Sequence, residues 1–199
     1  MATLQLTAST LAVTPAAGQL EFDGHFYATD SANVRGKLNR LIQRTVVATT
    51  SGTSIDFTSI PNWVKRITVM FQGVSTSGTS PLRVQLGSGT ITTTGYAGGM
   101  ITYNTNSLEG ATVTNGFPVD IANAGSAATT ARHGTVTITN LSGNTYVSTS
   151  VIGFSPGGLI GAHGGSSVTL ASVLDTIRIT SVNGTDTFDA GSINIIYEG

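Results

Sequence analysis

The chain has 199 residues, a formal net charge of −1 and only 10% charged residues, and it contains no cysteine. In ordinary soluble domains roughly a quarter of the residues are charged. The near-zero net charge means that this chain lacks the basic field that attracts nucleic acid. The low content of Glu, Lys and Arg also means that it is poor in helix-forming residues. Disulfides and thiolate metal sites are excluded. With no apolar run of about 18 residues and no basic region before an apolar stretch at the start, we expect no membrane segment and a product made in a cytoplasm.

The first 44 residues predict a small β-hairpin module. Residues 3–14 alternate apolar and polar side chains, which favours an extended segment. In residues 15–35, the Asp-Gly pair at positions 23 and 24 predicts a turn between two short strands. A hairpin of this size cannot bury its own apolar side, so we expect it to bind a partner or copies of itself, through Leu20, Phe22, Phe26, Tyr27 and Arg35.

Residues 34–44 fit two interpretations. Leu38, Leu41 and Ile42 follow helical spacing, which would give one or two helical turns. Gly36 weakens that interpretation, and a strand pattern through the same region is nearly as good. The composition changes close to Arg44, so the predicted division is an attachment module over 1–44 and a main domain over 45–199.

From residue 45 onward, short strand-like runs alternate with turn signals, as in a sandwich or barrel. The sequence predicts an all-β fold, an antiparallel, jelly-roll-like β-sandwich of about ten strands. Because strand residues alternate between faces, the pattern also predicts which side chains point inward; they are Ile67, Val69, Phe71, Val136, Ile138, Ile177, Ile179, Ile193 and Ile195. Trp63 is expected to close one end of this core.

Two loops look like hairpin turns. Ser142-Gly143-Asn144 is expected to join strands 135–141 and 145–152, and the loop 183–191 to join strands 176–182 and 192–198. The segments 87–126 and 155–167 are rich in glycine and threonine and have weak periodicity, so they predict long surface loops. Loops on a rigid β-scaffold are where recognition usually takes place.

Several tyrosine and asparagine side chains in these regions are of the kind that stacks on sugars and hydrogen-bonds them. We expect them to be exposed and to form a receptor or glycan contact; they are Tyr96, Tyr103, Asn104, Asn106 and Tyr146. The alternative interpretation is that they are ordinary loop residues.

Asn183, Asp186 and Asp189 supply oxygen ligands that could hold Ca²⁺. Their spacing departs from the EF-hand pattern, so capping of backbone amides in a turn is the favoured role. The three histidines lie in turn-like contexts with no G-x-S-x-G sequence around any serine. We therefore predict no catalytic residues, no enzyme activity and no cofactor.

The segment T-P-A-A-G-Q-L-E-F-D-G-H-F-Y-A-T-D-S-A-N-V-R at 14–35 resembles a hairpin element of phage tail-fibre and related virion proteins. The stretches 55–80, which begins I-D-F-T-S-I-P-N-W, and 174–198, which ends S-I-N-I-I-Y-E, look like the C-terminal β-domain of phage fibre and adhesin tips. The resemblance implies a homotrimeric virion appendage with β-sandwich heads and outward-facing loops.

The predicted function is that of a structural bacteriophage protein. We expect a short homotrimeric fibre whose N-terminal module docks on tail, baseplate or capsid proteins and whose head contacts a host-surface polysaccharide. The hairpin runs almost directly into the head without a shaft, so a capsid decoration or head-fibre protein is a second hypothesis. A polysaccharide depolymerase is a third, and neither nucleic acid nor membrane is an expected partner.

Overall fold

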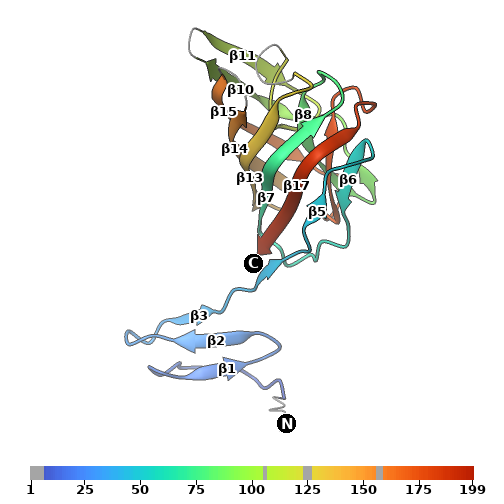
Figure 1. Ribbon diagram of the computed structural model, residues 1–199. Helices are drawn as coiled ribbons and strands as arrows, with labels where there is room; N and C mark the ends of the chain where they lie inside the picture. Colours follow the sequence, from blue (N-terminus) through green and yellow to red (C-terminus); the bar gives the residue numbers. More distant parts are fainter. Residues whose placement is uncertain (1–6, 105–106, 123–126, 156–158) are drawn as a thin grey trace. The chain divides into compact units, whose positions relative to one another are not determined.

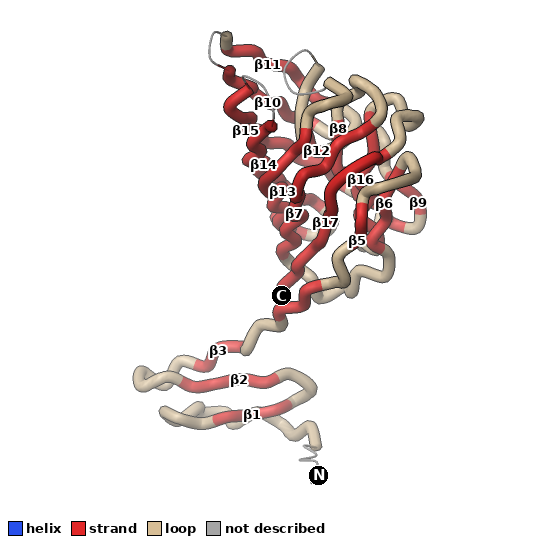
Figure 2. Tube along the Cα trace, viewed as in Figure 1, coloured by secondary structure: helices blue, strands red, loops and turns tan. Residues whose placement is uncertain are grey.

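A computed structural model of the chain describes residues 7–104, 107–122, 127–155 and 159–199. It divides into two compact units, an N-terminal unit over Met1–Arg40 and a large unit over Leu41–Gly199. All regular elements of the described residues are strands (Figure 2). The all-β prediction is confirmed.

The N-terminal unit is a three-stranded antiparallel sheet of β1 (Leu20–Phe22), β2 (Phe26–Thr29) and β3 (Arg35–Lys37). Phe22 pairs with Phe26 across the turn, where Gly24 adopts a φ of 109° that other residues rarely accept. The predicted hairpin is therefore present, with β3 added to its edge. Residues 7–14 form no strand, although Ser9 donates a backbone hydrogen bond to Phe22.

The large unit contains two antiparallel sheets. The longer sheet has the order β11-β10-β15-β14-β13-β7-β17-β4, and β5 also pairs with β17 (Figure 1). In chain order its strands are β4 (Leu41–Gln43), β5 (Val47–Ala48), β7 (Arg66–Thr76), β10 (Ala97–Asn104), β11 (Leu108–Val113), β13 (Ala131–Ser142), β14 (Thr145–Ser155), β15 (Leu159–Thr169) and β17 (Phe188–Glu198).

The shorter sheet has the order β12-β8-β16-β6, with β9 paired to β8. Its strands are β6 (Ser54–Phe57), β8 (Leu82–Ser88), β9 (Thr90–Ile91), β12 (Phe117–Pro118) and β16 (Thr176–Ser181). One hydrophobic core includes inward side chains of both sheets, which makes the large unit a sandwich.

The predicted inward residues form the centre of that core. All nine are buried, with exposed fractions between 0 and 4%. Trp63 is partly buried, packs against the core and lies 5.7 Å from Tyr197 between ring centroids. Period-two alternation therefore identified the buried faces of β7, β13, β16 and β17 correctly.

The two segments expected to be long loops are largely strands, so that prediction is wrong. β10 and β11 lie within 87–126, and β15 covers most of 155–167. Glycines interrupt the apolar–polar alternation in these strands, and they allow the backbones of neighbouring strands to approach closely. A Cβ on Gly98, for example, would lie 2.2 Å from the carbonyl oxygen of Gly165. The region also supplies buried Met100 and Val113 to a second, smaller core.

Two further expectations need correction. Residues 176–182 and 192–198 do not form a hairpin, because β16 pairs with β6 and β8 whereas β17 pairs with β7 in the other sheet. The boundary between the units lies after Arg40 rather than near Arg44, because β4 pairs with β17. By contrast, β13 and β14 form the hairpin predicted around Gly143.

Candidate functional site

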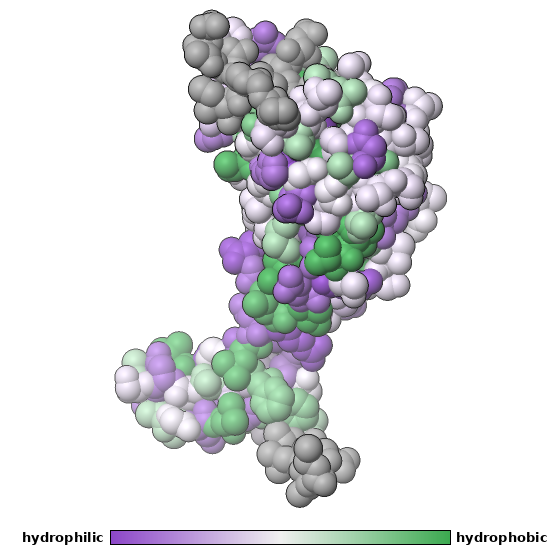
Figure 3. All heavy atoms as spheres, viewed as in Figure 1, coloured by the Kyte–Doolittle hydropathy of each residue, from purple (hydrophilic) through white to green (hydrophobic). Residues whose placement is uncertain are grey.

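The N-terminal unit carries a groove of about 500 Å³ along its first two strands. Three of the predicted partner-binding residues line it, namely Leu20, Phe22 and Phe26. The two phenylalanine rings lie 4.9 Å apart between centroids, and the side chains of Leu20 and Phe26 are 63% and 42% exposed. In Figure 3 this unit shows apolar patches on its surface.

This unit has almost no core of its own. Within its described residues, 7–40, Thr29 is the only buried one. Apolar Val34 and Leu38 are 61% and 49% exposed. Since folding of a small sheet depends on burying apolar area, these side chains need cover from another surface.

Arg35 has an internal role in the unit. Its Nε donates to Glu21 Oε2 at 2.7 Å, and its Nη2 donates to the carbonyl oxygen of Ala12 at 2.5 Å. The Ala12 N–H also donates a hydrogen bond to Glu21 Oε1. This bond and the contact with Arg35 lower the pKa of Glu21, although desolvation acts in the opposite direction. Arg35 thus connects β3 to Glu21 on β1 and to Ala12 in the segment before β1. Tyr27, by comparison, is half-buried on β2.

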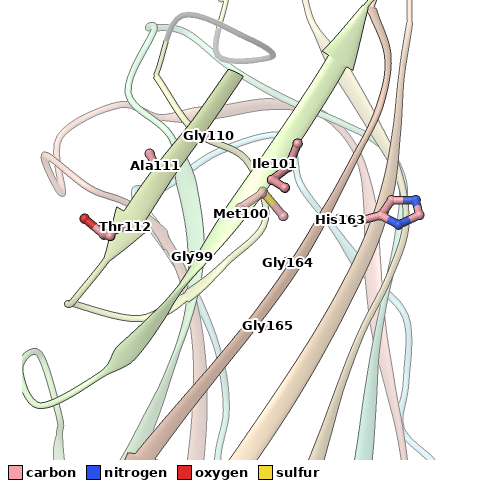
Figure 4. Close-up of a pocket in the computed structure, with 9 residues that line it drawn as sticks. All are labelled: Gly99, Met100, Ile101, Gly110, Ala111, Thr112, His163, Gly164 and Gly165. Carbon is pink, nitrogen blue, oxygen red and sulfur yellow. The ribbon is translucent and has the colours of Figure 1, made fainter. Parts of the chain in front are cut away.

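In the large unit, the outward face of β10, β15 and β14 forms a second candidate surface. A shallow cavity of about 590 Å³ lies over β10, β11 and β15, and four of its nine lining residues are glycines. Figure 4 shows these residues on the three strands. Ile101 pairs with His163, which pairs with Val151 on β14, and Ile101 and Val151 are each 50% exposed. The three strands β10, β14 and β15 contain no Asp, Glu, Lys or Arg, so they add no carboxylate, ammonium or guanidinium group to this face.

Tyr103 lies next to this cavity. Its hydroxyl is 3.1 Å from His163 Nε2, and the two rings meet edge to face with centroids 5.5 Å apart. The hydrogen bond fixes the aromatic ring beside bare glycine backbone. A flat floor bordered by an aromatic and an imidazole is suited to contact with a sugar.

Two of the predicted contact residues are not on the surface, so their expected exposure is wrong. Tyr96 is 3% exposed, packs edge to face on Phe117, and accepts a hydrogen bond from the Leu86 N–H; burial raises its pKa to about 12. Tyr146 is 7% exposed on the inward face of β14. The segment around Tyr96 was expected to be a loop and Tyr146 to be an exposed side chain of the strand 145–152, whereas both belong to the core.

Asn106 lies outside the described residues, and for Asn104 only the backbone at the end of β10 is described. Tyr103 is therefore the one member of the predicted set whose side chain is described at the surface. The hydrogen-bonding partner that sequence reasoning missed is His163. The pairing of β10 with β15 places Tyr103 close to His163. The two residues are 60 positions apart in the chain, so the local sequence around either of them does not indicate this contact.

The candidate calcium ligands are engaged by the protein itself. Asn183 Oδ1 accepts the N–H groups of Thr185 and Asp186, and Asp186 accepts the Ser80 N–H at 2.9 Å and the Asn183 amide at 2.6 Å. Asp189 accepts a hydrogen bond from the Ser75 hydroxyl. Within the described ranges no three Asp, Glu, His or Cys side chains gather as a metal site would require. These contacts support turn capping.

A buried charge cluster was not foreseen. The side chains of Asp120 and Arg132 are fully buried, and Arg132 Nε donates to Asp120 Oδ2 at 2.5 Å. The Leu82 N–H donates to the other Asp120 oxygen at 2.5 Å, and Arg132 Nη1 donates to the Thr130 carbonyl at 3.0 Å. Arg83, 7% exposed, also interacts with Asp120 electrostatically. Charged residues so well buried are unusual.

No protein-family model, no curated protein sequence and no solved structure matches this chain. None of the described residues belongs to a helix that could span a lipid bilayer.

Proposed function

We propose that this chain is a structural protein of a bacteriophage virion, a short homotrimeric fibre that contacts the host surface. Its N-terminal unit would dock on tail, baseplate or capsid proteins. Its β-sandwich unit would face outward and bind a host-surface polysaccharide rather than catalyse a reaction.

The observation that carries the proposal is the missing core of the N-terminal unit. A three-stranded sheet in which Thr29 is the only buried described residue leaves Leu20, Phe26 and Leu38 in contact with solvent. Each apolar side chain of this size gains about 1.5–3 kcal/mol on full burial. Association with copies of itself and with a particle protein supplies that burial, which supports both trimerisation and attachment.

The outward face of β10, β14 and β15 supports the recognition half of the proposal. Neutral sugars are bound by aromatic rings and hydrogen-bonding groups without a need for opposite charge. The Tyr103–His163 pair and the exposed glycine backbone beside it provide these groups. Figure 3 shows that much of the large unit's surface in this view has intermediate hydropathy, as its serine, threonine and glycine content predicts.

A capsid decoration or head-fibre protein is the alternative. It is favoured by the short connection between units, since only residues 38–40 separate β3 from β4. A fibre of this kind usually has a shaft, whereas a decoration protein does not need one.

Light scattering during size-exclusion chromatography tests the assembly. We expect a particle of three chains, and a stable monomer of 20.3 kDa would refute the trimer. Deletion of residues 1–40 should leave a folded β-protein that no longer joins the virion, and normal incorporation of this variant would refute the attachment role.

Location and adsorption separate the two candidates. Antibody against the protein should label the tail or baseplate of a fibre-bearing particle, and the isolated protein should compete with phage for host cells. Labelling of tail-less heads without such competition would favour the decoration protein.

A further inference from the structure

Arg83 on β8 is a buried cation whose Nε has no hydrogen-bond partner among the described residues. Its side chain is 7% exposed, its Nε is fully buried without a hydrogen-bond partner, and its guanidinium makes no hydrogen bond to any other described residue. A buried polar group without a hydrogen-bond partner is unfavourable, even when an opposite charge lies nearby. Arginine presents five donors, so this position is suited to an acceptor from outside the chain.

Asp120, which interacts with Arg83 electrostatically and lines the same cavity, forms its ion pair with Arg132 instead. Its two oxygens accept hydrogen bonds from the Leu82 N–H and from Arg132 Nε. Arg83 and Arg132 together with Asp120 carry a net charge of about +1 at neutral pH, since two cations surround one anion. Burial lowers the pKa of Arg83 to about 10, against the opposing effect of Asp120, so its guanidinium remains protonated at neutral pH.

Arg83 lines a cavity of about 350 Å³ at the start of β8. One part of the lining is apolar and includes Pro81, Val113 and Ile121. Another part is polar and includes Thr112, Thr114 and Asn115. Organic ligands with a few polar groups bind in cavities of this size and mixed character.

The position of Arg83 is fixed by backbone packing. A Cβ on Gly116 would lie 3.0 Å from each of the Arg83 Cβ, Cγ and Cδ atoms, so the aliphatic stem rests directly on the Gly116 backbone. Gln85, two residues further along β8, donates from its amide to the Asn115 carbonyl at 2.7 Å and holds the same loop. A guanidinium held in this way is preorganised for a ligand.

We propose that Arg83 binds the carboxylate of a small hydroxylated organic acid in this cavity. One excess positive charge matches one carboxylate, and guanidinium groups bind carboxylates through paired hydrogen bonds. The threonine and asparagine groups suit hydroxyls on the same ligand, and the apolar wall suits its carbon skeleton. A sugar acid combines these features, and the inference stands independently of the virion role.

Calorimetric titration of the purified full-length protein tests the site with glucuronate as the probe. Glucose tests the need for the carboxylate, acetate the need for the hydroxylated skeleton, and inorganic phosphate the preference for a carboxylate. We expect glucuronate to bind at least tenfold more tightly than any of the three. Failure of glucuronate to bind, or tighter binding of phosphate, would overturn the proposal.

Variants identify the residue responsible. Arg83→Met should weaken glucuronate binding at least tenfold, and Arg83→Lys should weaken it less because lysine keeps the charge but loses the planar fork. Arg178→Met is the matched control: Arg178 lies on the adjacent strand β16, and Asp56 already binds its guanidinium at 2.8 and 2.6 Å. Unchanged affinity in Arg83→Met, or an equal loss in the control, would refute the assignment.

Unfolding of Arg83→Met by itself would not decide the question, so a second variant keeps the charge and moves it. Gly116→Ala adds a methyl group against the Arg83 stem. It should weaken glucuronate binding while the circular dichroism of the protein is retained. Wild-type affinity in a folded Gly116→Ala protein would show that the position of Arg83 does not control binding.

Discussion

Asp120 is expected to stabilise the protein through the two arginines around it. Replacement of Asp120 by alanine would leave Arg132, whose side chain is fully buried, without its carboxylate partner. It would also leave Arg83 without the nearby negative charge and free the Leu82 N–H. Removal of one member of a buried ion pair costs about 3–5 kcal/mol, which is a large part of the 5–15 kcal/mol typical of a folded domain.

The pH dependence has the opposite sign from that of an aspartate whose pKa is lowered on folding by a salt bridge. Burial raises the pKa of Asp120 from 3.8 to about 6, against the lowering effect of Arg132. The folded chain therefore holds this proton more tightly than the unfolded chain, and the free energy of unfolding falls as pH rises between these values. At about 1.36 kcal/mol per pH unit, the span from 3.8 to about 6 corresponds to about 3 kcal/mol.

Urea denaturation at a series of pH values measures both effects. Asp120→Ala should lose about 3–5 kcal/mol at neutral pH, and a double variant with Arg132→Met should recover part of that loss. Relative to Asp120→Asn, which does not titrate, the wild type should lose stability between about pH 4 and about pH 6. A loss below about 1 kcal/mol in Asp120→Ala, or a wild type that gains stability over this pH range, would refute the reasoning.

Five further substitutions test the packing of the large unit by thermal or urea denaturation. Gly98→Ala should lower the free energy of unfolding by more than about 2 kcal/mol, because the added Cβ would lie 2.2 Å from a backbone oxygen. Gly153→Ala should lower it far less, because its Cβ would lie 3.9 Å from the nearest backbone oxygen. Equal losses in the two variants would refute the close contact between strands. Ile138→Ala, at a site 1% exposed, should cost about 2–5 kcal/mol, and Ile101→Ala, at a site 50% exposed, should cost clearly less; the reverse order would contradict the assigned faces. Arg178→Ala should cost no more than about 1 kcal/mol because its ion pair is partly exposed, so a loss of several kcal/mol would show that this pair is structural.

The fold could be predicted wherever strands bury one face and expose the other. β7 alternates apolar and polar side chains, so its inward residues Ile67, Val69 and Phe71 were evident from the sequence. β10 and β15 contain glycine at both inward and outward positions, which removes the alternation. Their strand character comes from backbone contacts between neighbours distant in sequence, and hydropathy patterns do not record such contacts.

The candidate sites depend still more on long-range register. Tyr96 looked exposed because its neighbours are small and polar, yet it fills the core against Phe117. The Tyr103–His163 pair joins residues of β10 and β15, and the cluster around Asp120 joins the segment after β12 to β8 and β13. A sequence offers many tyrosines and acids, and only the pairing of strands selects which of them meet.

The position of β17 within the long sheet has a consequence for the order of folding. β17 lies between β7 and β4, and its pairing with β7 joins Ile67 to Tyr197, residues 130 positions apart (197 minus 67). Contacts of such sequence separation form slowly because a long loop must close first. β4 and β5 have no partner other than β17 among the described strands, so the segment that links the two units should be secured only after this distant pairing. Under the proposed function, docking of the N-terminal unit would then depend on completion of the sandwich, because β4, the first strand after this unit, pairs with β17.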